Sequence, residues 1–202
     1  MRRNDSILEL PIAQAEFAIV DVETTGLSPK ENRLTEIAIF TIKNREVSDE
    51  FSTLINPLVT IPAFITDMTG IDNIMVADAP TAREIIPKVA EILYNKIFVA
   101  HNVEFDWGFV KESAKRERNI ELSNHKLCTV RLTRKLIPHL PSKSLGPVTK
   151  YFGIVVPERH RASGDAYATA ILLLRHLKTL ERQYSIKTVR QLLSFQFGGP
   201  VR

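Results

Sequence analysis

Short apolar runs separated by turn residues divide the first part of the chain into strands. Residues 17–20 (Phe-Ala-Ile-Val) are continuously apolar, which is typical of a strand buried on both faces. Residues 34–42 alternate apolar and polar positions and predict a second strand, with Ile37 and Ile39 on one face. A polar turn at residues 44–46 leads into a third strand over residues 47–55, so we expect a three-stranded meander.

Helical periodicity dominates after residue 60. Pro62, Gly70 and Pro80 interrupt a loop-rich stretch that we expect to hold one short helix near residues 62–68. Thr81 and Glu84 have the spacing of a capping box, which predicts the start of an amphipathic helix. One further buried strand is predicted at residues 97–100. Four further helices are predicted, one from about residue 105 and three at about residues 129–137, 144–152 and 163–182. This order indicates an α/β fold with a mixed central sheet flanked by helices.

The chain reads as one compact unit with short extensions. It has 202 residues, a length typical of one domain, and contains no internal repeat. Pro11 interrupts any regular element near the start, so residues 1–15 are interpreted as a lead-in arm. We expect the main domain at residues 16–180 and a C-terminal helical tail at residues 181–202.

The composition excludes a disordered or membrane-spanning chain. Apolar residues make up 44% and charged residues 25%, and no apolar run approaches the roughly 20 residues of a spanning helix. Cys128 is the single cysteine, so no intramolecular disulfide can form. With no export signal visible, this favours a cytoplasmic protein.

Positive charge is concentrated at the C-terminal end. The net charge is only +4, but residues 175–202 carry six Lys and Arg against one acidic residue. Such asymmetry favours a polyanionic partner, with an ordinary solvated helix face as the alternative.

Two carboxylates stand at the end of the first buried strand. Asp21 and Glu23 are two residues apart, so in an extended chain their side chains point to the same side. Like charges at the edge of an apolar core repel each other and resist desolvation. A divalent cation with oxygen ligands would relieve both effects. The alternative is a pair of exposed acids at a strand end.

The same design recurs twice later in the chain. Asp106 follows the strand at residues 97–100 near a helix start, and Asp165 opens a long helix whose first turns carry small residues. Those small residues predict close packing on the sheet, which would hold Asp165 near the other acids. His160 precedes that helix on a loop. The alternatives are two helix N-terminal acids and a surface histidine.

Three segments match one family pattern. Residues 17–27 (Phe-Ala-Ile-Val-Asp-Val-Glu-Thr-Thr-Gly-Leu), 100–106 (Ala-His-Asn-Val-Glu-Phe-Asp) and 160–166 (His-Arg-Ala-Ser-Gly-Asp-Ala) resemble the three motifs of the DEDD 3′–5′ exonucleases. The spacing of five residues between His160 and Asp165 resembles that of the third motif in the DEDDh, or DnaQ-like, branch. That branch includes the proofreading epsilon subunit of DNA polymerase III and ribonuclease T. The resemblance runs from about residue 17 to about residue 177.

The resemblance implies a ribonuclease-H-like fold and a two-metal active site. It implies two Mg²⁺ or Mn²⁺ ions held by Asp21, Glu23, Asp106 and Asp165, with His160 as general base. It also implies a substrate-binding set, namely Thr24, Thr25, Gly26, Leu27, His101, Asn102, Phe105 and His160. For His101 and Asn102 the alternative is that they only brace the site through hydrogen bonds. The remaining histidines match no motif position and are expected at the surface: His125, His139 and His176.

The function predicted is metal-dependent 3′–5′ hydrolysis of DNA ends in replication proofreading or repair, releasing nucleoside monophosphates. One alternative is an RNA 3′-end-trimming exoribonuclease of the ribonuclease T or oligoribonuclease type. Another is a polymerase-associated binding subunit. The expected partners are single-stranded 3′ ends of nucleic acid and a DNA polymerase as a separate chain, with no membrane. Residues of helical spacing in the tail either dock on that polymerase or pack on the main domain: Ile186, Val189, Leu192, Leu193 and Phe195.

Overall fold

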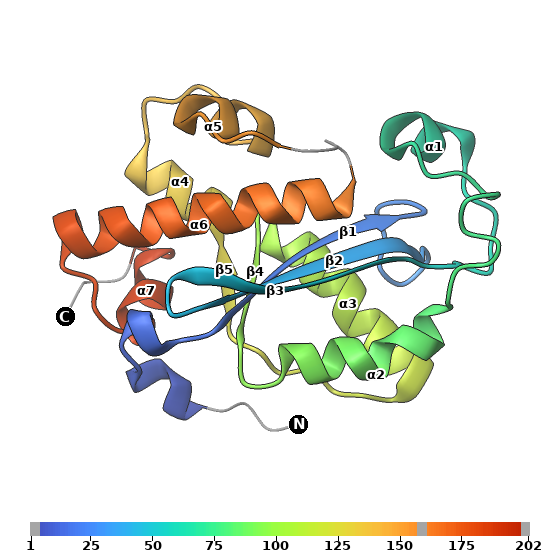
Figure 1. Cartoon of the computed structure of the whole chain (residues 1–202), viewed down its shortest axis with the longest axis horizontal. Helices are drawn as coiled ribbons and strands as arrows, with labels where there is room; N and C mark the ends of the chain where they lie inside the picture. The colour runs from blue at the N-terminus through green and yellow to red at the C-terminus, as the bar shows by residue number, and fades with distance from the viewer. Residues whose placement is uncertain (1–4, 157–160, 199–202) are drawn as a thin grey trace.

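A mixed five-stranded sheet forms the centre of the molecule, in the order β3-β2-β1-β4-β5 (Figure 1). The computed structural model describes residues 5–156 and 161–198. The strands are β1 (Phe17–Thr24), β2 (Leu34–Lys43), β3 (Glu46–Leu54), β4 (Ile97–Ala100) and β5 (Lys126–Cys128). β1 pairs antiparallel with β2 and parallel with β4. The predicted α/β class, the meander and the buried fourth strand are therefore confirmed. β5 was not predicted, because three residues carry too little periodicity to signal a strand.

Helices cover both faces of the sheet. They are α1 (Ala63–Thr69), α2 (Ala82–Leu93), α3 (Val103–Arg118), α4 (Thr129–Leu136), α5 (Leu145–Phe152), α6 (Ala162–Tyr184) and α7 (Val189–Phe195). In Figure 1 α6 runs across one face, with α2 and α3 on the other. Alternate residues of β1 contribute to the two cores: Phe17 and Ile19 pack with α6, whereas Ala18 and Val20 pack with α2 and α3.

Small side chains bring α6 close to β1 and β2. Ala162, Ala166 and Ala170 are fully buried in the core on this face, at a spacing that places them on one side of the helix. The close packing predicted from the small residues is confirmed, and it carries the start of α6 to the end of β1.

β2 differs from its prediction. We expected apolar and polar positions to alternate along this strand, but every residue from Leu34 to Ile42 is buried, because β2 is an inner strand with helices on both faces. The polar members Thr35, Glu36 and Thr41 are buried with it.

The two ends of the described chain are joined. The amide of Ile12 donates to the carbonyl of Lys187 at 2.9 Å, and the amide of Val189 donates to the carbonyl of Leu10 at 3.1 Å. Tail residues Ile186, Val189, Leu192 and Phe195 belong to the α6-side core, which favours packing over docking for this segment. α6 itself continues past the predicted domain end at residue 180. None of the helices in the described ranges is both long and apolar enough to cross a membrane.

Candidate active site

The end of β1 directs two carboxylates toward the start of α6. Asp21 and Glu23 continue the alternation of Phe17 and Ile19, so their side chains lie on the α6 side of the sheet, beyond the point where its apolar core ends. Both are partly buried. The strand therefore places two acids where contact with bulk water is restricted.

Two helix N-termini supply the other acids. Asp106 lies in the first turn of α3 and is 4% exposed. Backbone N–H groups of Asp106 itself and of Val22 interact with its carboxylate. Because Val22 lies between Asp21 and Glu23 on β1, this contact places Asp106 against the strand that carries those two acids. Asp165 lies in the first turn of α6 and is partly buried. The structure thus brings the four predicted acids to one end of the sheet.

The four acids act on one another electrostatically. Burial raises the pKa of Asp21 well above its ordinary value, and the charges of Asp106, Glu23 and Asp165 raise it further. Burial, followed by the charges of neighbouring acids that include Asp165 and Asp106, raises the pKa of Glu23 to about 8. Burial raises the pKa of Asp106 to about 7, although the backbone N–H groups oppose this. The cluster is a site of concentrated and poorly solvated negative charge.

The donor set fits a hard divalent cation. Carboxylate oxygens are the ligands that Mg²⁺ and Mn²⁺ prefer, and a bound cation would reverse the raised pKa values by stabilising the charged forms. Within residues 5–156 and 161–198, no three Asp, Glu, His or Cys side chains already stand in a metal-binding arrangement.

The loop after β1 is held by its own threonines. The hydroxyl of Thr24 donates to the carbonyl of Gly26 at 2.6 Å, and the hydroxyl of Thr25 accepts the amide of Arg33 at 3.0 Å. A Cβ on Gly26 would lie 2.7 Å from the end of the Asn32 side chain, which accepts the amide of Ser28, so a larger residue would require Asn32 to move. The turn leaves Leu27, four residues after Glu23, with 78% of its surface exposed.

The second motif supplies a braced histidine. Nε2 of His101 lies 2.9 Å from the carbonyl of Lys143, and Nδ1 lies 2.9 Å from the Thr129 hydroxyl. Because a carbonyl only accepts, Nε2 carries the proton and Nδ1 accepts from Thr129. Burial lowers the pKa of His101 to about 4, so the ring is neutral. This favours the bracing role. Phe105 is half-buried and packs on Phe109 at a ring-centroid distance of 5.0 Å, and Asn102 is exposed.

The other histidines divide into three cases. His160, the predicted base, lies outside the described residues. His125 and His176 were expected at the surface, and this was wrong: they are 8% and 1% exposed. His176 lies on the buried side of α6, with Nε2 2.8 Å from the Thr133 hydroxyl. Its spacing from Leu172, Leu173 and Leu180 was the available signal. His139 contacts Tyr151 near the surface.

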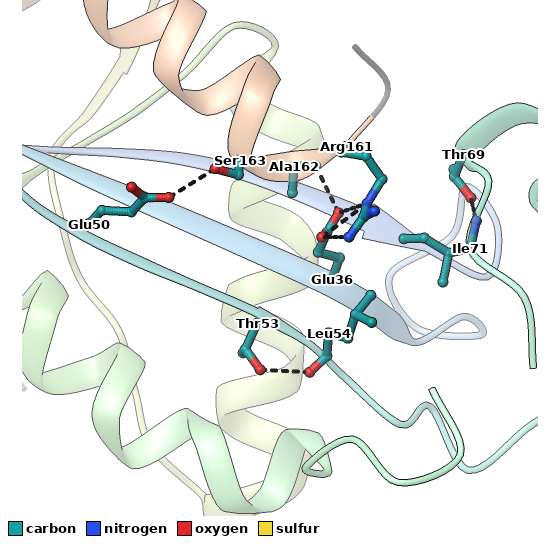
Figure 2. A network of polar contacts seen from close by, with 9 residues as sticks. All are labelled: Glu36, Glu50, Thr53, Leu54, Thr69, Ile71, Arg161, Ala162 and Ser163. Atoms are coloured by element: carbon teal, nitrogen blue, oxygen red, sulfur yellow. Dashed lines mark hydrogen bonds and ion pairs between the residues drawn. The ribbon is translucent and has the colours of Figure 1, made fainter. Parts of the chain in front are cut away.

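Glu36 was missed by the sequence analysis. It lies on β2 directly opposite Glu23 and is 3% exposed. Its carboxylate accepts hydrogen bonds from the Arg161 guanidinium and from the amide of Ala162 (Figure 2). The signal was a charged residue inside a predicted strand.

The fold is a mixed α/β sheet with a cluster of four acids at one end. Comparison with known proteins extends this result: the chain belongs to the exonuclease family (RNase_T), whose sequence pattern matches residues 18–173. The family predicted from the motifs is therefore confirmed.

Named relatives fall into two groups. The DNA polymerase III subunit epsilon of Aquifex aeolicus is 32% identical over 198 residues, which cover 98% of this chain and 96% of that protein. The PolC-type DNA polymerase III of Caldanaerobacter subterraneus subsp. tengcongensis is 38% identical over 90% of this chain. This chain spans 13% of that longer protein, and 12% of its Clostridium perfringens counterpart.

Solved structures agree with this assignment. Exonuclease X in complex with 5′ overhanging duplex DNA superposes with a TM-score of 0.68 at 26% identity, over 88% of this chain and 99% of that one. Exonuclease I superposes with a TM-score of 0.74 at 20% identity, over 91% of this chain and 43% of that one, which supports the fold.

Proposed function

We propose that this chain is a divalent-metal-dependent 3′–5′ exonuclease that releases nucleoside monophosphates from DNA ends in replication proofreading or repair. The observation that carries the proposal is the convergence of Asp21, Glu23, Asp106 and Asp165 from three distant segments onto one end of the sheet. Similarity to an epsilon subunit and to exonuclease X, solved with duplex DNA, favours DNA over the RNA alternative.

The four carboxylates would hold two Mg²⁺ or Mn²⁺ ions. When bound, such ions neutralise phosphate charge, lower the pKa of water and stabilise a leaving oxygen. The chain's own part is to keep the ligands close, partly dry and attached to rigid elements. Because Glu23 and Asp106 have pKa values of about 8 and 7, cation binding is expected to displace protons from them near neutral pH.

The surrounding residues would receive the DNA end. Leu27 is exposed beside the acids, and we assign it to the terminal base. Glu23 and the backbone at Thr24 are assigned to the terminal 3′-hydroxyl. His160 is assigned as the base that accepts the proton of the attacking water, because imidazole titrates near neutral pH. The remaining predicted contacts are Thr25, Gly26, Phe105, His101 and Asn102, with His101 acting mainly as a brace.

Digestion of 5′-labelled oligonucleotides tests the proposal. With Mg²⁺ or Mn²⁺, single-stranded DNA should shorten stepwise from its 3′ end, and a chelator should stop the reaction. A matched RNA oligonucleotide should be degraded more slowly. Faster RNA digestion would support the exoribonuclease alternative instead. Cleavage from the 5′ end, or metal-independent cleavage, would overturn the proposal.

A replicative DNA polymerase is the protein partner we propose, with the chain acting in the cytoplasm. Similarity to epsilon and PolC-type proteins supports this partner. Deleting residues 181–202 should make the protein less soluble, because the apolar residues of this segment belong to the core. We do not expect a loss of polymerase association with solubility and activity intact. A soluble, fully active truncated protein that no longer binds polymerase would show docking instead.

A further inference from the structure

An ion pair between a buried carboxylate and a partly exposed guanidinium joins β2 to the start of α6. Nη2 of Arg161 lies 2.7 Å from Oε1 of Glu36, and Nε lies 3.2 Å from each carboxylate oxygen. The amide of Ala162 donates to Oε2 of Glu36 at 2.8 Å. Figure 2 shows the Glu36 side chain reaching from the strand to Arg161 and Ala162. One carboxylate therefore holds both the residue before α6 and its first residue.

The position of this pair relates it to the acidic cluster. Glu36 is the cross-strand partner of Glu23, and such partners have Cβ atoms about 5 Å apart on the same face. On the helix side, Ala162 precedes Asp165 by three residues, which is less than one turn. The contact therefore joins β2, which lies beside Glu23, to the first turn of α6, which carries Asp165.

Stability alone does not account for the pair. Taking the Glu36 carboxylate and part of the Arg161 guanidinium out of water costs free energy that can exceed their attraction, so apolar replacements of such pairs are often neutral or stabilising. The two-oxygen contact with the Arg161 guanidinium and the hydrogen bond from the Ala162 amide instead fix the direction and distance of the start of α6 relative to β2. The side chains are 4% and 31% exposed, so water competes little for the Glu36 carboxylate.

We propose that Glu36 is a positioning residue: through Arg161 and the Ala162 amide it fixes the start of α6, so that Asp165 meets Asp21, Glu23 and Asp106 around a divalent cation. Glu36 itself touches neither the cation nor the DNA. This inference rests on the proposed function, because it presumes that the four acids bind the cation.

Replacement of Glu36 by glutamine provides the test. Glu36→Gln keeps the shape and one acceptor oxygen but removes the charge that orients Arg161. We expect Mn²⁺ affinity, measured by calorimetry at pH 8, to fall about 10- to 100-fold, as for residues that orient metal ligands. At saturating Mn²⁺ the KM for DNA should stay unchanged while kcat falls. Unchanged Mn²⁺ affinity would overturn the inference.

Glu50→Gln is the matched control. Glu50 accepts a hydrogen bond from Ser163 at 2.9 Å, on the same turn of α6, but is exposed (Figure 2). The control should bind Mn²⁺ as the unmodified protein does. Equal losses in both variants would show that any bond to this turn matters, which would overturn the specific role of Glu36.

A double variant covers the case in which Glu36→Gln folds poorly. Glu36→Gln/Arg161→Gln removes both charges of the pair, so a defect caused only by taking the Glu36 carboxylate away from Arg161 should disappear. The positioning role predicts that Mn²⁺ binding stays weak, and full recovery would overturn it. If the unmodified protein itself binds no Mn²⁺, the proposed function fails, which is a distinct result.

Discussion

Glu23 and Glu36 face each other across β1 and β2, yet their surroundings are opposite. Glu36 has a guanidinium and a helix-start amide as partners. Around Glu23, burial and the charges of Glu36, Asp165 and Asp106 outweigh the opposing effect of Arg161, so its pKa rises to about 8. The comparison distinguishes two uses of one chemical group. A carboxylate with internal partners joins elements, and a carboxylate among other acids is suited to bind a cation.

The largest expected effect comes from Asp21→Asn, which removes one charge from the cluster. Exonuclease activity should fall at least about 10³-fold, because a metal ligand contributes several kcal/mol to the transition state. The melting temperature in chelator at pH 8 should be unchanged or higher, because the variant relieves repulsion around Asp21. Asp165→Ala should lose activity similarly.

Asp67→Ala is the control for this experiment, because Asp67 is an exposed acid on α1. It should keep full activity. Wild-type turnover in Asp21→Asn would remove Asp21 from the active site.

Cation binding gives the next largest effect. Mn²⁺ at about 100 times its dissociation constant should stabilise the fold by about 2.7 kcal/mol, seen as a rise in melting temperature that a chelator reverses. The rise should be larger at pH 8 than at pH 6, because protons compete for Glu23 and Asp106 at the lower pH. Asp21→Asn should lose most of this rise. An equal rise in that variant would mean that Mn²⁺ binds elsewhere.

The metal-free protein should become less stable between pH 6.5 and pH 8. An acid whose folded-state pKa is raised stabilises the fold at low pH, and this contribution is lost as pH rises toward the folded pKa. Glu23 and Asp106, at about 8 and 7, are still losing protons in this window. Each should cost on the order of 1–2 kcal/mol.

The buried histidines act in the opposite direction but mostly below this window. Burial lowers the pKa values of His101 and His176 to about 4, so most of their contribution develops as pH rises to 6.5, and only about 0.4 kcal/mol from each is still gained above it. Denaturant unfolding in chelator at pH 6.5 and pH 8 measures the difference, and Glu23→Gln should reduce it. Stability that is flat or rises with pH would contradict the assignment.

The smallest effect concerns a paired acid at the surface. Glu181 accepts a hydrogen bond from Arg45 at 2.6 Å, but the two side chains are 22% and 48% exposed. Glu181→Gln should cost less than about 1 kcal/mol in urea unfolding, because water screens such pairs, and activity should not change. A loss as large as that of Glu36→Gln would show that burial is not what separates these pairs.

Local patterns in the sequence predicted most elements because each depends on nearby residues. The small residues of α6 and the acids at the ends of β1 and β4 also carried enough information to predict convergence. Glu36 was different: its partner Arg161 lies 125 residues away, and nothing near Glu36 indicates a guanidinium. His176 likewise depends on Thr133, 43 residues earlier. Partners brought together only by tertiary folding could not be predicted from spacing.

The bridge between Pro11 and Thr188 places the incoming and outgoing backbone side by side. A polypeptide that enters at one of these points leaves beside it, so this unit can sit within a larger protein as an insertion without separating the flanking sequence. The same architecture is thus compatible with a free-standing nuclease and with a module interrupting a host enzyme. Insertion of this kind would depend on the place where these two backbone segments meet, ten residues before Asp21 and 23 residues after Asp165.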